Sequence, residues 1–378
     1  MKKFFYAGLA GLLVFEVLRV YFIMPMPGSQ RSQSLDTAYF LHQWRWEIRA
    51  LFGVCCALGL AAALRPSSRK STIALLATGA AVVWLFNGKF SADHMFLEPE
   101  SVRMLPAASS KVPGERLVMG LVMGREARAY PIQYLAYHHQ VRDTVAGTPV
   151  LVTYCSVCRT GRVFASLIDG EPETFRLVGM DHFNAMFEDS KTGTWWRQVN
   201  GEAVAGPLKG TFLPEIQSFQ TTLSQWLKLY PNARILQADP AAEGKYSKDL
   251  KYEKGASRDE LTGTDPDSWK DKSWVVGVQA GTASKAYDWN RLKKERIVND
   301  WVGKTPVVLV LARDTASFAA FQRPDDQVIF SLSGDSLKAP GYAFDLMGRS
   351  PSGRLRALPA SQEFWHSWKT FQPSTARY

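Results

Sequence analysis

Residues 118–154 read VMGLVMGREARAYPIQYLAYHHQVRDTVAGTPVLVTY, and residues 275–311, which lie 157 positions further on, read VVGVQAGTASKAYDWNRLKKERIVNDWVGKTPVVLVL. The two segments align without a gap and are identical at 12 of 37 positions. The identities include a glycine at a predicted hairpin turn, Gly124 in the first segment and Gly281 in the second. Self-similarity at a fixed spacing indicates that one structural unit occurs twice.

Each copy has the pattern of a β-rich unit with short helices. Short apolar runs bounded by turn residues predict strands, and residues 132–138 and 222–229 predict helices. We expect the first copy at residues 115–236 and the second at residues 273–378. Residues 237–272 have no apolar periodicity and are interpreted as an exposed charged insertion. The predicted fold class is α+β, a β-rich pseudo-twofold duplicated domain preceded by three transmembrane helices.

Three apolar segments lie within residues 1–90 and predict a membrane domain. Residues 4–26 are long enough to cross a bilayer, which needs about 20 residues. Residues 48–64 and 71–86 are shorter and rich in Ala, Gly and Leu, which lets helices pack closely in a membrane. A signal peptide is the alternative for the first segment, but no short apolar core ends in an Ala-x-Ala site. The lipid bilayer is therefore an expected partner.

The distribution of charge predicts the orientation of these helices. Ten basic and three acidic residues precede Phe90, so most of the net charge of +10 belongs to the membrane domain. Basic residues there are a topology signal, and we expect no nucleic-acid partner. We expect the N-terminus, with Lys2 and Lys3, and the basic loop at residues 65–70 to lie on the cytoplasmic side. Three crossings then place the soluble part on the extracytoplasmic side of the cytoplasmic (inner) membrane, in an oxidising compartment.

Cys155 and Cys158 carry the most distinctive chemistry of the soluble part. Two cysteines spaced by two residues at the end of a predicted strand bring both sulfurs to one point, which permits a disulfide, a redox dithiol or half of a copper or zinc site. Arg159 stands where a c-type haem needs His, so covalent haem is excluded, and no Gly-rich loop supports a nucleotide cofactor. The second copy has Ala312 and Thr315 at the equivalent positions. The shared scaffold therefore does not by itself require the thiols.

Residues 147–158, with the sequence GTPVLVTYCSVC, resemble the signature of the bacterial domain-of-unknown-function family 3179. Further matching elements follow in order: DSKTGTWW at residues 189–196, GEAVAG at residues 201–206 and GYAFD at residues 341–345. The resemblance covers about residues 114–378. The family has no assigned activity, so the resemblance implies an uncharacterised domain and leaves the reaction open.

The resemblance also implies a histidine shortly before the cysteine strand, and His138 holds that position. Asn184 matches the family pattern as well. The family commonly has an acidic residue after the histidine and an Asn-Asp pair later, whereas this chain has His139 and Arg142-Asp143 there.

Two hypotheses for the function follow. In the first, a membrane-anchored protein uses Cys155 and Cys158 for thiol redox exchange with a small molecule or redox protein, or for soft-metal binding with His138 as third ligand. In the redox version, the Arg159 cation is expected to lower the pKa of Cys158, and Cys155 resolves the mixed disulfide. The expected surrounding residues are Tyr154, Arg159, Thr160 and Asn184. In the second hypothesis, the chain is a non-catalytic ligand- or partner-binding module in which the cysteines form a structural disulfide.

Overall fold

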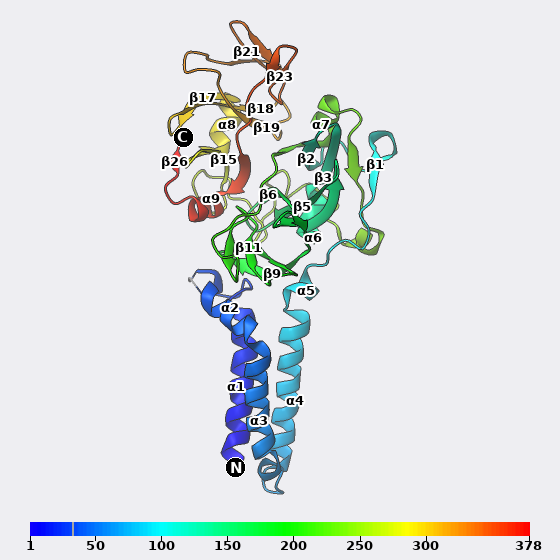
Figure 1. Ribbon diagram of the computed structural model, residues 1–378, viewed down its shortest axis with the longest axis vertical. Helices are drawn as coiled ribbons and strands as arrows, with labels where there is room; N and C mark the ends of the chain where they lie inside the picture. The colour runs from blue at the N-terminus through cyan, green and yellow to red at the C-terminus, as the bar shows by residue number, and fades with distance from the viewer. Residues whose placement is uncertain (32–33) are drawn as a thin grey trace. The chain divides into compact units, whose positions relative to one another are not determined.

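The computed structural model describes residues 1–31 and 34–378 (Figure 1). It contains helices and many short strands, which confirms an α+β protein. The chain divides into two compact units. The membrane unit comprises Met1–Leu97, Glu173–Arg197 and Glu202–Phe212, and the second unit comprises Glu98–Pro172, Gln198–Gly201 and Leu213–Tyr378.

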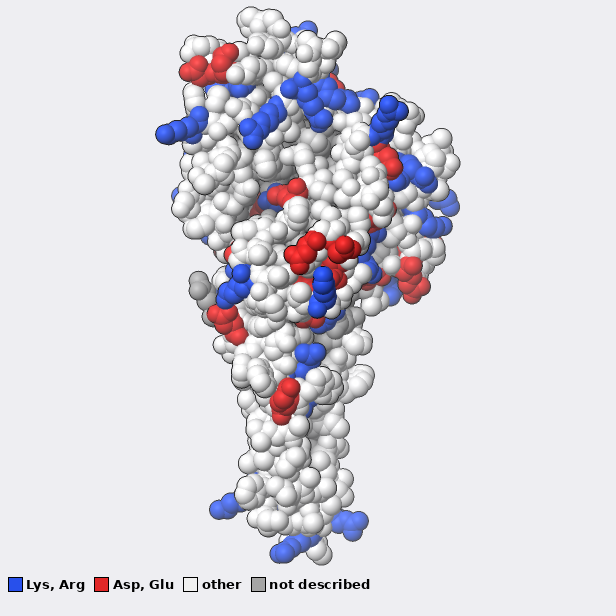
Figure 2. All heavy atoms as spheres, in the orientation of Figure 1, with Lys and Arg blue, Asp and Glu red and all other residues white. Residues whose placement is uncertain are grey.

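Three helices of the membrane unit are long and apolar enough to cross a bilayer, which confirms the three predicted apolar helices. They are α1 (Lys2–Tyr21), α3 (Arg45–Ala63) and α4 (Arg69–Trp84), the last continued by the π-helical turn η2 (Leu85–Lys89). On the visible face, these helices carry few charges between their two ends (Figure 2). Glycine lets α1 and α3 approach closely, because a Cβ at Gly59 would lie 2.3 Å from the backbone nitrogen of Phe5.

The membrane unit also contains a four-stranded antiparallel sheet with the order β12-β11-β10-β9. Its strands are β9 (Phe175–Asp181), β10 (Asn184–Asp189), β11 (Trp195–Arg197) and β12 (Ala203–Ala205). The backbone N–H of Met180 donates to the carbonyl of Ile23 at 2.7 Å. The ring of Tyr39, in the short helix α2 (Leu35–Gln43), lies edge-on to the buried Trp195. The sheet therefore packs with the N-terminal helices, although it lies far from them in the sequence.

The second unit contains two sets of elements that follow the same order along the chain. The first set is β2 (Leu117–Met123), β3 (Glu126–Pro131), α6 (Ile132–His138), β4 (Gln140–Val145), β5 (Thr148–Cys155), β6 (Thr160–Ala165), β13 (Ser218–Thr222), α7 (Leu223–Leu229) and β14 (Arg234–Leu236). The second set is β15 (Trp274–Ala280), β16 (Ala283–Asp288), α8 (Trp289–Glu295), β17 (Ile297–Val302), β18 (Thr305–Leu311), β19 (Phe318–Gln322), β25 (Ala360–Phe364), α9 (Trp365–Phe371) and β26 (Ala376–Arg377).

The two sets also agree in strand order and in register. The strands β14-β3-β2-β13 and β26-β16-β15-β25 lie in the same order, and β4-β5-β6 matches β17-β18-β19. Val118 pairs with Pro131, and Val275, 157 positions later, pairs with Asp288. A glycine on the first strand of each set makes room for an indole, because a Cβ at Gly120 would lie 2.4 Å from the ring of Trp226. At Gly277 the same atom would lie 2.1 Å from Trp368.

Shorter elements complete the two units. They are α5 (Ala92–Met95), η1 (Ser29–Arg31), β1 (Met104–Pro106), η3 (Ala107–Ser109), β7 (Leu167–Ile168), β8 (Glu171–Pro172), η4 (Pro240–Lys245), β20 (Ser331–Ser333), β21 (Ser336–Ala339), β22 (Tyr342–Phe344), β23 (Arg349–Ser350) and β24 (Gly353–Arg354). The charged segment at residues 237–272 is partly buried rather than uniformly exposed, since Tyr246 and Glu253 are both covered. Glu253 forms an ion pair with the buried Arg116 at 2.7 Å.

Candidate dithiol site

The two cysteines lie at the turn between β5 and β6. Cys155 is the last residue of β5 and pairs with Thr160, the first residue of β6, so Cys158 lies within the connecting turn. Both residues are fully buried, and neither forms a disulfide. The thiol of Cys158 is hydrogen-bonded to Cys155. The fold therefore places the two sulfurs side by side.

The second set of elements borders this turn. The backbone N–H of Phe364, at the end of β25, donates to the carbonyl of Cys158 at 3.0 Å. Ser367, in the first turn of α9, is hydrogen-bonded to the Cys158 thiol. Its Oγ also donates to Oε2 of Glu363 at 3.0 Å. A chain of polar groups thus leads from Cys158 through Ser367 to a carboxylate.

Glu363 is a fully buried acid with several partners. Ser361 Oγ donates to its Oε1 at 2.7 Å, and Arg162 Nη2 donates to the same oxygen at 3.2 Å. Burial raises the pKa of Glu363, because the loss of water outweighs the stabilisation of the carboxylate by Arg162 and the serines. A raised pKa makes Glu363 a better proton acceptor than an ordinary surface carboxylate.

The expectation that Arg159 activates Cys158 is wrong. Burial raises the pKa of the Cys158 thiol well above its usual value, and Cys155 and Glu363 add to the rise. Arg159 has a left-handed backbone with φ 59°. Its guanidinium lies 3.7 Å from the ring centroid of Trp274. It donates to Gln362 Oε1 at 2.8 Å and to the backbone carbonyls of Tyr252 and Glu253 at 3.0 and 3.2 Å.

Lys272 is the cation that interacts with the thiols. Ionised Cys158 and Cys155 both favour its charged form, although burial lowers the pKa of Lys272. Its Nζ donates to the carbonyl of Val157 at 3.1 Å. His366 Nε2 lies 3.2 Å from the same carbonyl, and burial lowers the pKa of His366 to about 4. Near neutral pH, the imidazole of His366 is therefore neutral.

His138, the third metal ligand expected from the sequence, contacts a tyrosine. It ends α6, and its Nε2 lies 2.6 Å from the hydroxyl of Tyr246. Residues 1–31 and 34–378 contain no group of three or more His, Cys, Asp or Glu side chains arranged to hold a metal ion. The donor set expected for copper or zinc, Cys155 and Cys158 with His138, is therefore not assembled. His139 caps α6 in a left-handed conformation, and burial lowers its pKa to about 4.

The other residues expected to surround the cysteines are Tyr154, Thr160 and Asn184. The hydroxyl of Tyr154 lies 3.1 Å from that of Tyr252, which in turn donates to the carbonyl of Ser156 at 3.0 Å. Thr160 Oγ1 donates to the carbonyl of Cys158 at 3.4 Å. Asn184 lies on β10 of the membrane unit, where it pairs with Asp181.

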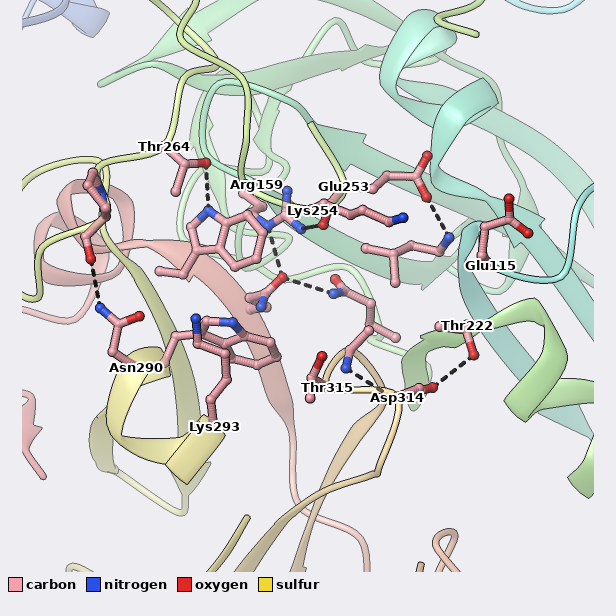
Figure 3. A pocket seen from close by; sticks show the side chains of 18 of the residues that line it. Glu115, Arg159, Thr222, Glu253, Lys254, Thr264, Asn290, Lys293, Asp314 and Thr315 are labelled. Atoms are coloured by element: carbon pink, nitrogen blue, oxygen red, sulfur yellow. Dashed lines mark hydrogen bonds between the residues drawn. The ribbon is translucent and has the colours of Figure 1, made fainter. Parts of the chain in front are cut away.

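A cleft of about 680 Å³ lies within the second unit, with Arg159 in its lining (Figure 3). Trp274 and Trp289 form part of its wall, and Lys254 and Lys293 also line it. Neither cysteine lines this cleft. Arg159 connects the two features, because it follows Cys158 directly and extends its side chain to the cleft.

No curated protein and no solved structure matches the chain. One family, described as "Protein of unknown function (DUF3179)", matches residues 98–375. The match spans most of the chain and confirms the resemblance carried by the cysteine strand and the later motifs. The chain therefore belongs to the DUF3179 family, whose members have no assigned function.

Proposed function

We propose that the chain is a membrane-anchored protein in which Cys155 and Cys158 cycle between a dithiol and a disulfide. The observation that carries the proposal is the contact of the two thiols with each other inside a network that contains Lys272 and Glu363. Two cysteines that only fill space need neither a buried cation nor a buried acid, and both groups are costly to bury. Ionisable groups around a thiol pair are typical of sites where protons and electrons move.

The repeated architecture provides a comparison for this site. We infer that the two sets of elements in the second unit arose by duplication, which the matching strand orders and registers support. The turn between β18 and β19 in the second set is equivalent to the cysteine turn, and it is contacted by Thr222 at the end of β13. Thr222 Oγ1 donates to Asp314 at 2.8 Å, and the Thr222 N–H donates to Ser317 Oγ at 2.9 Å. Hydrogen bonds without sulfur hold that turn in place. The cysteines therefore add a property that the scaffold does not require.

The reaction we propose is thiol–disulfide exchange with a partner that carries a disulfide. Cys158 passes its proton through Ser367 to Glu363, and its thiolate attacks one partner sulfur, so that a mixed disulfide forms and a partner thiolate leaves. Cys155 then loses its proton and attacks the Cys158 sulfur, which releases the second partner thiolate. Both leaving thiolates take up one proton each. In total, two protein thiols become one disulfide, and one partner disulfide becomes two thiols.

Lys272 favours this reaction by stabilising negative charge on either sulfur. Complete burial opposes it, because a partner has to reach the turn. Residues of the segment 237–272 cover the turn, since Tyr252 and Lys272 donate to the carbonyls of Ser156 and Val157. Exchange therefore requires these contacts to open.

The cleft supports a second candidate function, the binding of a small molecule. It combines two tryptophans with polar and charged side chains, which is the usual composition of a ligand pocket. In that case the cysteine turn is structural, and it holds Arg159 at the cleft.

A redox titration distinguishes the two functions. Full-length protein with Cys55→Ser and Cys56→Ser leaves only the proposed pair to be counted, and thiols are quantified after equilibration in buffers of known potential. We expect a two-electron midpoint above about −300 mV, the region below which structural disulfides lie. The Cys158→Ser variant of this background should lose the two-electron transition. A pair that stays oxidised at about −300 mV contradicts the redox proposal and favours the binding module.

A further inference from the structure

A second site lies in the membrane unit, where a cavity of about 270 Å³ has three arginines in its lining. They are Arg19, Arg45 and Arg176, and His42 lies beside them. Apolar residues, among them Val20 and Phe90, complete the wall. The cavity therefore combines a strongly basic part with an apolar part.

The cavity is lined by residues from one end of each of the three candidate membrane-spanning helices. Arg19 lies in the last turn of α1, Arg45 is the first residue of α3, and Phe90 follows η2 directly. Trp44 and Trp46, beside Arg45, are 52% and 66% exposed. Tryptophans at the end of a membrane span mark the depth of the lipid headgroups. The basic part of the cavity therefore lies at headgroup depth.

The arginines near this cavity outnumber their acidic partners. Glu16 forms ion pairs with both Arg19 and Arg49, at 3.5 and 2.6 Å. The Arg19 atom in this ion pair, Nε, is buried and forms no hydrogen bond among the atoms described.

The other two arginines differ in their partners. Glu188 is shared by Arg176 at 2.6 Å and His42 at 2.9 Å. Among the side chains that the structure describes, Arg45 has no carboxylate within ion-pair distance, and its Nη1 donates to the backbone carbonyl of His42 at 2.6 Å. A bound anion would neutralise the positive charge of this arginine cluster that the carboxylates do not balance.

We propose that this cavity binds the phosphate headgroup of an anionic phospholipid. Guanidinium groups recognise phosphate through paired charge-assisted hydrogen bonds, and Arg45 is the arginine whose charge is free to be neutralised. The apolar wall at Val20 and Phe90 fits the glycerol and the first methylenes of the acyl chains. A soluble phosphate ester shares the anionic chemistry but gains nothing from that wall. Basic pockets between membrane helices bind lipid headgroups in the same way.

The test compares the unfolding temperature of the full chain in detergent after addition of phosphatidylglycerol, phosphatidylcholine or glycerol 3-phosphate. A ligand that binds only the folded state raises this temperature. We expect phosphatidylglycerol to raise it and the other two to leave it unchanged. The Arg45→Gln variant should need at least fivefold more phosphatidylglycerol for the same shift. The matched control is Arg69→Gln, at the opposite end of the spans, which should behave like the wild type.

Equal shifts with both lipids overturn the proposal, as does an unchanged response of Arg45→Gln. A shift with glycerol 3-phosphate as large as that with phosphatidylglycerol assigns the cavity to a soluble phosphate instead. If Arg45→Gln fails to fold, native mass spectrometry of the wild type decides the question. Retention of phosphatidylglycerol over phosphatidylcholine from an equal mixture supports the site, and equal retention rejects it.

Discussion

Lys272 is a partly buried cation whose charge interacts with the two thiols. Its ammonium stabilises the thiolates of Cys158 and Cys155, so replacing it removes a favourable charge from the ionised form. We expect Lys272→Gln to raise the pKa of Cys158 further and to slow its alkylation about tenfold at a fixed pH, because a smaller fraction of the thiol is ionised. Lys270→Gln, at an exposed position two residues away, is the control. Equal alkylation rates in the two variants mean that Lys272 does not influence the pair.

His366 gives the site a pH dependence of known sign. Burial lowers its pKa to about 4 in the folded protein, whereas the unfolded chain has a value near 6.5. The unfolded state therefore binds a proton first as the pH falls, and folding stability is lost between about pH 6.5 and 4. After allowance for the partial exposure of His366, we expect the free energy of unfolding of His366→Gln to fall about 2 kcal/mol less than that of the wild type on acidification.

Chemical denaturation at pH 7 and pH 4.5 measures this effect. His94→Gln, at an exposed position, is the control and should keep the wild-type difference. A His366→Gln protein with the full wild-type loss between the two pH values shows that the imidazole is already charged in the folded state.

At the scale of the elements, the repeated glycine–tryptophan contacts are a test of equivalence. Gly120→Ala and Gly277→Ala each push a Cβ into an indole, Trp226 in one case and Trp368 in the other. Overpacking of this kind costs about 1–3 kcal/mol, and we expect losses of that size in both variants. Gly244→Ala is the control, since no atom lies within 4 Å of its added Cβ. A neutral Gly277→Ala variant, with Gly120→Ala destabilised, contradicts equivalent packing in the two sets.

The elements themselves were predictable from the sequence, because their signals are local. The helix at residues 132–138 has the bounds that α6 has in the structure. The turn glycines Gly124 and Gly281 both have positive φ, which glycine adopts without strain. The three helices that are long and apolar enough to span a membrane were predictable from apolar length alone.

Half of the candidate site was not predictable, because it comes from the other set of elements. Glu363 and Ser367 meet Cys158 only after β25 and α9 pack against the turn between β5 and β6. No local pattern relates residues that lie 205 or more positions apart. One signal in the sequence pointed to these residues. Glu363 of the second set aligns with Thr221 of the first set, and the two cysteines of the first set align with residues other than cysteine in the second. Glu363 and Cys158, two positions at which the two sets differ in chemistry, are connected in space through Ser367.

At the scale of the whole molecule, the redox proposal depends on the compartment that holds the second unit. Lys2, Lys3 and the loop at residues 65–70 predict that this unit is extracytoplasmic, where a disulfide persists. We expect a membrane-impermeant maleimide, added to intact spheroplasts, to label a Lys111→Cys variant. A Ser67→Cys variant should be labelled only after the membrane is opened. The converse pattern would place the dithiol in the reducing cytoplasm, where the pair would remain as thiols and a disulfide would form only transiently.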